Sequence, residues 1–141
     1  GVIEMAARPL GIALASGATF LARGYAGDIM HLKGILKQGV EHRGFALIDV
    51  LQPCVTFNKV NTYQWYQERI HKLETEEGYD PTSRVMAFQK AEEWGDKINV
   101  GVYYKEDRST YEDELPMIAE KPLAEQNIDN IDISDAMKFY M

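Results

Sequence analysis

The chain contains one cysteine, Cys54, whose thiolate could attack an electrophile or bind a soft metal. It follows a run of apolar residues, 45–51, and the pair Gln52-Pro53. Proline ends a strand and fixes the backbone φ, so we expect the thiol at the rim of a sheet rather than within it. Ligands of open α/β sheets bind at that rim, just past the carboxyl ends of parallel strands.

Spacing alone leaves three interpretations of Cys54 open. A lone free cysteine is commonly an inert, buried small residue. A catalytic thiol needs a nearby base, and none of the three histidines, His31, His42 and His71, has a recognisable spacing to it. Zinc needs about four ligands, and the sequence has no cluster of cysteine and histidine, so Cys54 could only complete a metal site whose other ligands lie outside this chain.

The segments that must hold Cys54 predict a strand–helix–strand unit. Residues 18–22 form a short run of β-type residues, and residues 45–51 are the near-continuous apolar strand typical of a sheet buried on both faces. Between them, Asp28 is a good N-cap for a helix with apolar residues at helical spacing, namely Ile29, Leu32, Ile35, Leu36 and Val40. We expect the two strands to be parallel with a right-handed crossover.

The other predicted elements lie on both sides of this unit. A helix over residues 9–15 precedes it. Later elements are helices over 62–76 and 82–94, a strand over 100–104, a polar arm over 105–130 and a short helix over 133–141. Such an arm either wraps on another chain or is a loosely packed tail.

Three further features carry weaker predictions. The glycine-rich turn at 24–28 lacks the spacing of a dinucleotide-binding loop and the lysine of a P-loop, so we interpret it as a structural turn. Lys33 and Lys37 form either a basic spot for an acidic partner or an ordinary solvated helix face. The aromatic residues at 63, 65 and 66 are expected in a core or an interface.

Composition excludes several classes of protein. The 141 residues are enough for one domain with a hydrophobic core, and 45% are hydrophobic and 26% charged, as in globular proteins. A net charge of −7 argues against a nucleic acid as the main partner. The apolar runs are too short to cross a membrane, and no signal peptide is visible. With one cysteine, no disulfide framework is implied, so we expect a cytoplasmic protein.

The sequence also resembles a known family, the β subunits of the thiamine-diphosphate-dependent 2-oxoacid:ferredoxin oxidoreductases. The similar stretches are P-L-G-I-A-L-A-S-G-A-T-F-L-A-R-G at 9–24, G-D-I-M-H-L at 27–32 and E-H-R-G-F-A-L-I-D-V-L-Q-P-C-V-T-F-N at 41–58. The likeness continues more loosely to about residue 114. Residues 52–58 are its most specific part.

The resemblance implies a role for Cys54. In this family the β subunit holds a four-iron, four-sulfur cluster, and the cysteine of the Q-P-C-V-T-F-N segment is one of its four ligands. A thiolate suits such a cluster. The family's Cys-x-x-Cys pair is missing here, as is the Gly-Asp-Gly motif that holds magnesium and the diphosphate. The sequence therefore looks like the C-terminal half of such a subunit: a truncated chain, a proteolytic product or a split subunit.

These observations together define the expected protein. Its fold class is α/β, with residues 1–58 as the C-terminal part of a thiamine-diphosphate-binding, parallel-sheet domain and residues 59–141 as a helical and extended C-terminal extension. The resemblance implies oxidative decarboxylation of a 2-oxo acid to acyl-CoA, with electrons passed to ferredoxin, and an α subunit as partner. Half a domain exposes sheet edges and apolar surface, so we expect an oligomer. The alternatives are a non-catalytic α/β interaction module and, less in keeping with the residues, a cysteine hydrolase.

Overall fold

The computed structural model describes residues 3–127, 129 and 131–140. Residues 1–108 form one compact unit, and residues 109–141 form a second unit. The first unit contains a four-stranded sheet with the order β2-β1-β4-β3. The functional division predicted at residue 58 lies inside the first unit and stays a prediction.

The strand–helix–strand unit predicted from the sequence is confirmed. Strand β1 (Phe20–Tyr25) pairs in parallel with β2 (Ala46–Leu51), and helix α2 (Ile29–Glu41) connects them. Asp28 caps α2, since its Oδ1 atom accepts a hydrogen bond from the His31 backbone N–H at 3.1 Å. The first strand begins two residues later than predicted because Ala18 and Thr19 still belong to the turn after the preceding helix.

The other half of the sheet is antiparallel to this unit. Strand β4 (Ile98–Lys105) runs antiparallel to β1, and the short β3 (Ile70–Lys72) runs parallel to β4. The register between β1 and β4 shifts at Leu21/Ala22, where a β-bulge lies. The sheet is therefore mixed, with two parallel pairs joined along the antiparallel contact of β1 with β4.

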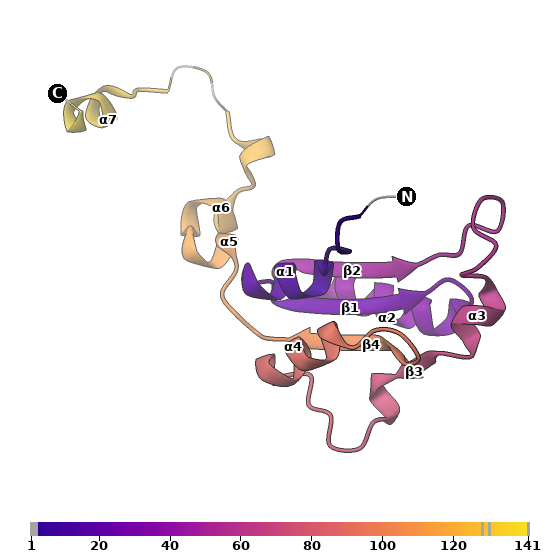
Figure 1. The fold of residues 1–141 in the computed structure, drawn as a ribbon. Helices are drawn as coiled ribbons and strands as arrows, with labels where there is room; N and C mark the ends of the chain where they lie inside the picture. Colours follow the sequence, from indigo (N-terminus) through magenta and orange to yellow (C-terminus); the bar gives the residue numbers. More distant parts are fainter. Residues whose placement is uncertain (1–2, 128, 130, 141) are drawn as a thin grey trace. The chain divides into compact units, whose positions relative to one another are not determined.

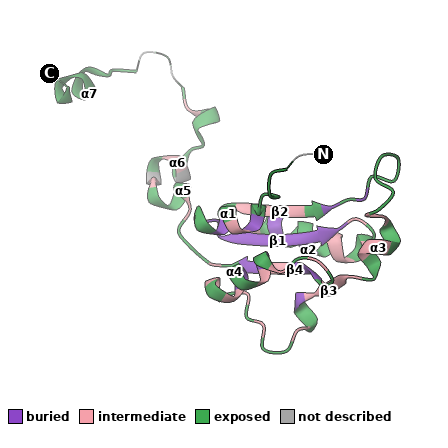
Figure 2. Cartoon of the chain, in the orientation of Figure 1, coloured by how far each residue is buried: buried purple, intermediate pink, exposed green. Residues whose placement is uncertain are grey.

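Helices cover both faces of the sheet (Figure 1). Helices α1 (Pro9–Ala15) and α4 (Arg84–Glu92) lie on one face, where their side chains pack on Leu21 and Tyr103. Helix α2 lies on the other face, where Ile35 packs with Phe20 and Ala22. The strict alternation of Phe20, Leu21 and Ala22 between the two faces is the two-residue period of a β-strand. Figure 2 shows the buried residues concentrated in β1 and β4.

One prediction about burial is wrong. Strand β2 lies at an edge of the sheet and is only partly buried, not buried on both faces. The apolar stripe of α2 does not all face the core, because Ile29 is 73% exposed, Leu36 43% and Val40 86%. The side of α2 that meets the sheet is centred on Ile35 and Gly39; a Cβ atom on Gly39 would lie 2.6 Å from Ile48 Cδ1.

The helix predicted over 62–76 is also wrong. Thr62 does cap a helix there, but α3 spans only Tyr63–Gln67. Arg69 Nη1 donates a hydrogen bond to the Trp65 carbonyl oxygen at 2.9 Å and so closes the helix, after which the chain enters β3 and the 3-10 turn η1 (Leu73–Thr75). Pairing with β4 satisfies the backbone of β3, a long-range gain that local sequence does not report.

The second unit, residues 109–141, contains only short helical segments in its described part. These are α5 (Tyr111–Glu114), α6 (Pro116–Glu120), the 3-10 turn η2 (Leu123–Glu125) and α7 (Ser134–Phe139). Thr110 and Asp113 form a capping box at the start of α5. The polar arm predicted over 105–130 overlaps this unit, but Lys105 ends β4 and the first unit continues to Arg108. The terminal helix predicted over 133–141 is found as α7. Residues 128, 130 and 141 of these predictions lie outside the described residues. No described helix of the chain is long and apolar enough to cross a membrane.

Candidate functional site at the carboxyl ends of β1 and β2

The parallel strands β1 and β2 end side by side, and the residues that follow them form the candidate site. The Ala26 backbone N–H donates to the Leu51 carbonyl oxygen at 3.0 Å, which joins the two strand ends. After β1 the chain turns at Gly27 and enters α2, whereas after β2 it continues into the loop 52–62 that carries Cys54.

Cys54 is exposed, and the residue before it, Pro53, is buried. The loop folds back on itself, since the Asn58 backbone N–H donates to the Cys54 carbonyl oxygen at 2.9 Å. Asn58 Oδ1 in turn accepts from the backbone N–H groups of Val60 and Asn61, both at 2.9 Å. These bonds place the thiol on the outside of a compact turn beyond the strand end. The interpretation of Cys54 as a buried core residue is therefore wrong.

The structure does not bring a histidine to Cys54. The His42 ring hydrogen-bonds to Thr19, the His31 ring to Glu74 and the His71 ring to Glu76. No group of three or more His, Cys, Asp or Glu side chains that could hold a metal ion lies among the described residues. Cys54 is thus a single exposed thiol that could supply one ligand of a metal centre. The described part of the chain does not contain the other ligands in a cluster with it.

A hollow of about 500 Å³ lies beside the N-terminus of α2, and Cys54 is not among its lining residues. Asp28 lines it, and Lys72 Nζ lies 2.7 Å from Asp28 Oδ2. The hydrogen bond from Lys72, followed by that from the His31 backbone, holds the pKa of the Asp28 carboxyl below its ordinary value. A capped helix end that already holds a carboxylate leaves little attraction for a further anion. The glycine-rich turn provides the N-cap of α2, and its interpretation as a purely structural turn stays a prediction.

An aromatic cluster supports the loop that carries Cys54. Tyr25 at the end of β1 lies with its ring centroid 5.7 Å from Tyr66 and 6.2 Å from Tyr63. Tyr25 Oη donates a hydrogen bond to the Tyr63 carbonyl oxygen at 2.9 Å, and burial raises the pKa of the Tyr25 hydroxyl. Trp65 packs edge-on against Tyr66 at 4.9 Å. Trp65 and Tyr66 are partly buried and pack against the core cluster that includes Tyr25, as expected, whereas Tyr63 is 40% exposed.

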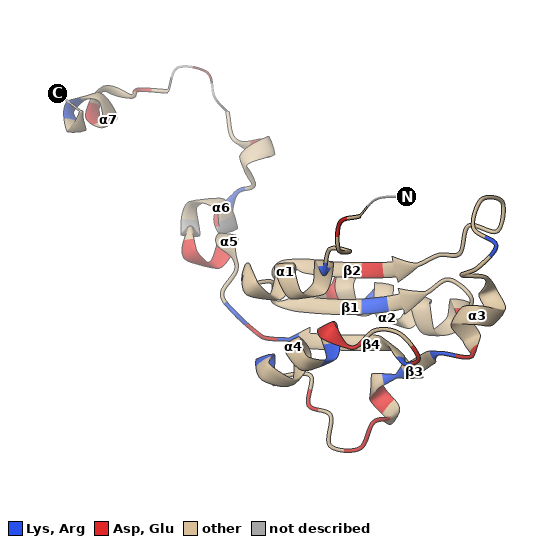
Figure 3. Ribbon diagram, in the orientation of Figure 1, with Lys and Arg blue, Asp and Glu red and all other residues tan. Residues whose placement is uncertain are grey.

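Sequence reasoning missed a buried ion pair in the middle of the parallel strands. Arg23 in β1 and Asp49 in β2 are register partners, and Arg23 Nε lies 2.8 Å from Asp49 Oδ2. In Figure 3, β1 carries a basic (blue) segment and β2 an acidic (red) one. The arginine side chain is only 5% exposed and the aspartate side chain 25%. Arg23 Nη1 also donates to Tyr103 Oη at 3.3 Å, and its guanidinium lies 5.2 Å from the Trp94 ring centroid. The available sequence signal was a single charged residue within each of two apolar strands, basic in one strand and acidic in the other.

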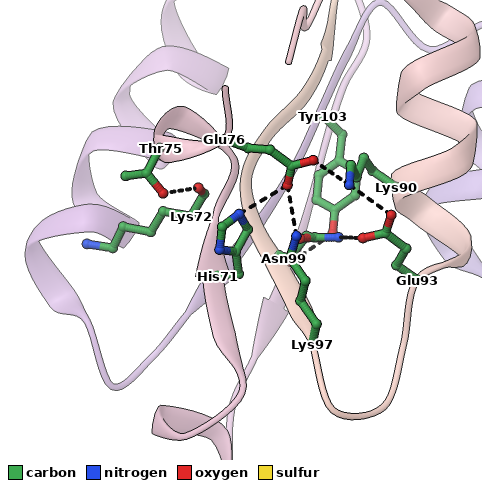
Figure 4. A network of polar contacts seen from close by, with 9 residues as sticks. All are labelled: His71, Lys72, Thr75, Glu76, Lys90, Glu93, Lys97, Asn99 and Tyr103. Carbon is green, nitrogen blue, oxygen red and sulfur yellow. Dashed lines mark hydrogen bonds and ion pairs between the residues drawn. The ribbon is translucent and has the colours of Figure 1, made fainter. Parts of the chain in front are cut away.

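Tyr103, which accepts a hydrogen bond from Arg23, also belongs to a polar network that reaches β3 (Figure 4). Tyr103 Oη donates to the Asn99 carbonyl oxygen at 2.7 Å, and Asn99 Nδ2 donates to Glu93 Oε2 at 2.7 Å. Lys90 bridges Glu93 and Glu76, with Nζ–O distances of 2.8 and 2.5 Å. Hydrogen bonds from Lys90 and then from Lys97 lower the pKa of Glu76 to about 2. This network joins α4 to the turn after β3 and serves the fold.

Comparison with known proteins links these features to one family. Residues 54–120 match the model of a protein family, the C-terminal part of the pyruvate ferredoxin oxidoreductase beta subunit. The chain is 46% identical over 112 residues to a 2-oxoacid:ferredoxin oxidoreductase subunit beta from a Sulfolobus species, an alignment that covers 73% of this chain and 37% of the relative. It is 39% identical over 149 residues to the corresponding protein of Saccharolobus solfataricus, covering 92% and 49%. This chain is a homologue of 2-oxoacid:ferredoxin oxidoreductase β subunits.

A solved structure extends the relation to the whole chain. The 2-oxoglutarate:ferredoxin oxidoreductase from Magnetococcus marinus, determined with 2-oxoglutarate, coenzyme A and succinyl-CoA bound, superposes with a TM-score of 0.78 at 27% identity. The superposition covers 100% of this chain and 47% of the solved chain. The α/β fold class and the family resemblance are therefore confirmed. The chain spans about half or less of the length of these relatives.

Proposed function

We propose that the chain forms part of the β subunit of a 2-oxoacid:ferredoxin oxidoreductase. The complete enzyme would oxidatively decarboxylate a 2-oxo acid to an acyl-CoA and pass the electrons through an iron–sulfur cluster to ferredoxin. The observation that carries this proposal is the 46% identity to a named β subunit, together with the family match that begins at Cys54. We further propose that the enzyme works in the cytoplasm, in line with a single free cysteine.

The proposed role of Cys54 is to supply one thiolate ligand of a four-iron, four-sulfur cluster. Its exposed position past the end of β2 supports this role, because a cluster that exchanges electrons with a partner must be reachable from the surface of the protein. The chain has no second cysteine, so the other three ligands would come from other parts of the enzyme. The loop residues Val55, Phe57 and Val60 are also exposed and apolar, which suits a loop covered by those parts.

Thiamine diphosphate and magnesium would supply the carbon chemistry when bound, and we assign no residue of this chain to them. Asp28, the polar group that follows the end of β1, is committed to capping α2 and to Lys72. The proposed contribution of this half of the protein is therefore to position one cluster ligand in the loop that follows β2.

The surfaces left open support an assembly. Strand β2 is an edge strand of apolar sequence, and the groove of about 510 Å³ between it and α1 is lined mainly by apolar residues such as Ile12, Phe45 and Leu47. Edges and apolar patches of this kind are normally covered. We propose that the α subunit and the rest of the β subunit together cover them, in an oligomer that takes 2-oxo acid, coenzyme A and ferredoxin.

The test is to produce the chain together with the remaining part of the β subunit and with the α subunit. We expect a brown complex that contains about four irons per β subunit and reduces ferredoxin with a 2-oxo acid and coenzyme A. Cys54→Ala should lose iron while the complex still assembles, whereas the exposed neighbour variant Thr56→Ala should keep it. An iron-replete Cys54→Ala complex would remove the ligand role.

The alternative is a non-catalytic α/β interaction module that keeps the fold and has lost the chemistry. It is consistent with the absence of any metal-binding cluster among the described residues. This alternative predicts a colourless complex without ferredoxin reduction even when all the parts are present. The assembled wild-type complex therefore distinguishes the two functions directly.

A further inference from the structure

Helix α2 has an exposed apolar stripe in addition to the side that packs on the sheet. Ile35 and Gly39 are buried against β1 and β2. The second stripe, which we call the α2 seam, consists of Ile29, Leu32, Leu36 and Val40. Leu32 is partly buried and reaches Gly24 in β1, whereas the other three are 43–86% exposed.

The spacing of the α2 seam is that of a helix-packing surface. Its members follow one another at intervals of three, four and four residues. This is the repeat with which a second helix packs alongside at a shallow angle. The seam lines a groove of about 460 Å³ on the surface of α2, with walls that are mainly hydrocarbon. A helix that is apolar on more than its core side is normally covered by a neighbour.

The charges beside the seam define what can cover it. Lys33 and Lys37 lie one turn apart along the groove, and both are exposed. Lys37 Nζ lies 3.6 Å from Glu41 Oε1, an exposed pair that contributes little. Lys33 has no hydrogen-bond or ion-pair partner among the residues that the structure describes. The charged residues that line the groove are therefore Lys33, Lys37 and Glu41, a net positive border on a chain whose net charge is −7.

The positive border argues against a second copy of this chain as the occupant. In an antiparallel pairing of two α2 helices centred at residue 35, Lys33 of one copy would lie toward Lys37 of the other. Like charges at such positions oppose helix pairing, and opposite charges favour it.

We propose that the α2 seam is a docking site for an amphipathic helix of a partner protein, with apolar residues filling the groove and glutamate or aspartate facing Lys33 and Lys37. The apolar side chains provide the affinity, and the charges select an acidic helix over a basic one. This inference does not depend on the proposed enzyme activity, because it concerns only the surface of α2.

Two designed helical peptides test the proposal on the full chain. Both carry leucine at the apolar heptad positions, one with glutamate and the other with lysine at the flanking positions, and binding is measured by fluorescence anisotropy. We expect the glutamate peptide to bind at least about tenfold more tightly, with the advantage shrinking between about 0.05 and about 0.5 M salt. The double variant Lys33→Glu/Lys37→Glu should reverse the preference.

Two single variants locate the binding site. Leu36→Asp should abolish binding of both peptides, because it places a charge in the centre of the groove. Val85→Asp, which changes a residue 68% exposed on α4, should leave binding unchanged. Circular dichroism on each variant confirms that the fold is retained.

Three results would overturn the proposal. Equal binding of the two peptides, or a preference that the double variant does not reverse, would show that the lysines select nothing. If neither peptide binds, the seam is not a docking site for a helix. A dimer of the wild-type chain that Leu36→Asp dissociates in sedimentation would make a second copy the occupant.

Discussion

The buried pair of Arg23 and Asp49 leads to a sharp prediction about stability. Asp49→Ala removes the carboxylate that accepts from Arg23 Nε at 2.8 Å. The arginine would keep only its longer bond to Tyr103 Oη and its contacts with aromatic rings. Because the Arg23 side chain is 5% exposed, water cannot easily replace the lost carboxylate.

The expected cost can be estimated from this burial. Removing one partner of a buried ion pair typically lowers the free energy of unfolding by about 3–5 kcal/mol. Asp49 is 25% exposed, so some solvent already reaches the pair, and we expect a loss of about 3 kcal/mol. At a denaturant dependence of about 1.5 kcal/mol per molar urea, the unfolding midpoint falls by about 2 M.

The assay is urea unfolding of the full chain, followed by tryptophan fluorescence and circular dichroism. Trp94 lies near the Arg23 guanidinium and reports on the site. Two variants serve as controls. Arg23→Met/Asp49→Leu removes both charges and should lie within about 1 kcal/mol of the wild type, because no unpaired charge remains. Asp135→Ala breaks the exposed pair with Lys138 and should change stability by less than about 0.5 kcal/mol.

Either of two results would contradict a cost set by the unpaired arginine charge. One is an Asp49→Ala variant whose stability is within about 1 kcal/mol of the wild type, which would mean that the pair is effectively solvated. The other is a double variant as unstable as the single one, which would mean that packing rather than charge burial sets the cost.

Three further predictions concern protonation and glycine. Because the pKa of Glu76 is lowered from 4.5 to about 2, its contribution to stability is fully present above about pH 4.5 and is lost as the pH falls toward 2; acid titration of unfolding should show this loss, and Glu76→Gln should flatten it. Burial lowers the pKa of His42 below 6.5, so the unfolded chain binds more protons than the folded one. The free energy of unfolding should therefore fall as the pH drops below about 6.5. A His42→Phe variant whose free energy of unfolding depends on pH as steeply as that of the wild type would contradict this. Gly34→Ala on the open surface of α2 should stabilise the protein by about 0.5–1 kcal/mol and so raise the thermal midpoint. Gly101 has φ +119°, and the Cβ atom of Gly101→Ala would lie 2.7 Å from Glu74 Oε1, so this variant should have a lower midpoint.

The strand–helix–strand unit could be predicted because its signals are local. The apolar run at 46–51, the N-cap Asp28 and the helical spacing from Ile29 each depend on neighbours within a few residues. The position of Cys54 followed from Pro53 in the same way. These features needed no knowledge of how distant segments pair.

The features that could not be predicted depend on long-range pairing. Strand β3 exists because residues 70–72 align with β4, nearly thirty residues later, and the local pattern resembled a helix. The Arg23–Asp49 pair requires the register of β1 with β2, which the sequence does not state. The side of α2 that faces the sheet contains Ile35 and Gly39, and the apolar spacing alone did not distinguish Ile35 from the exposed Ile29, Leu36 and Val40.

The edge position of β2 has a consequence for how the chain behaves alone in water. Along an edge strand, every second backbone amide points away from its neighbour and is free to meet another molecule. Deuterium should therefore enter β2 in an alternating pattern, fast at one residue and slow at the next. A segment as apolar as Ala46–Leu51 also invites strand addition, so concentrated samples should gelate or precipitate unless a companion polypeptide occupies that row of amides.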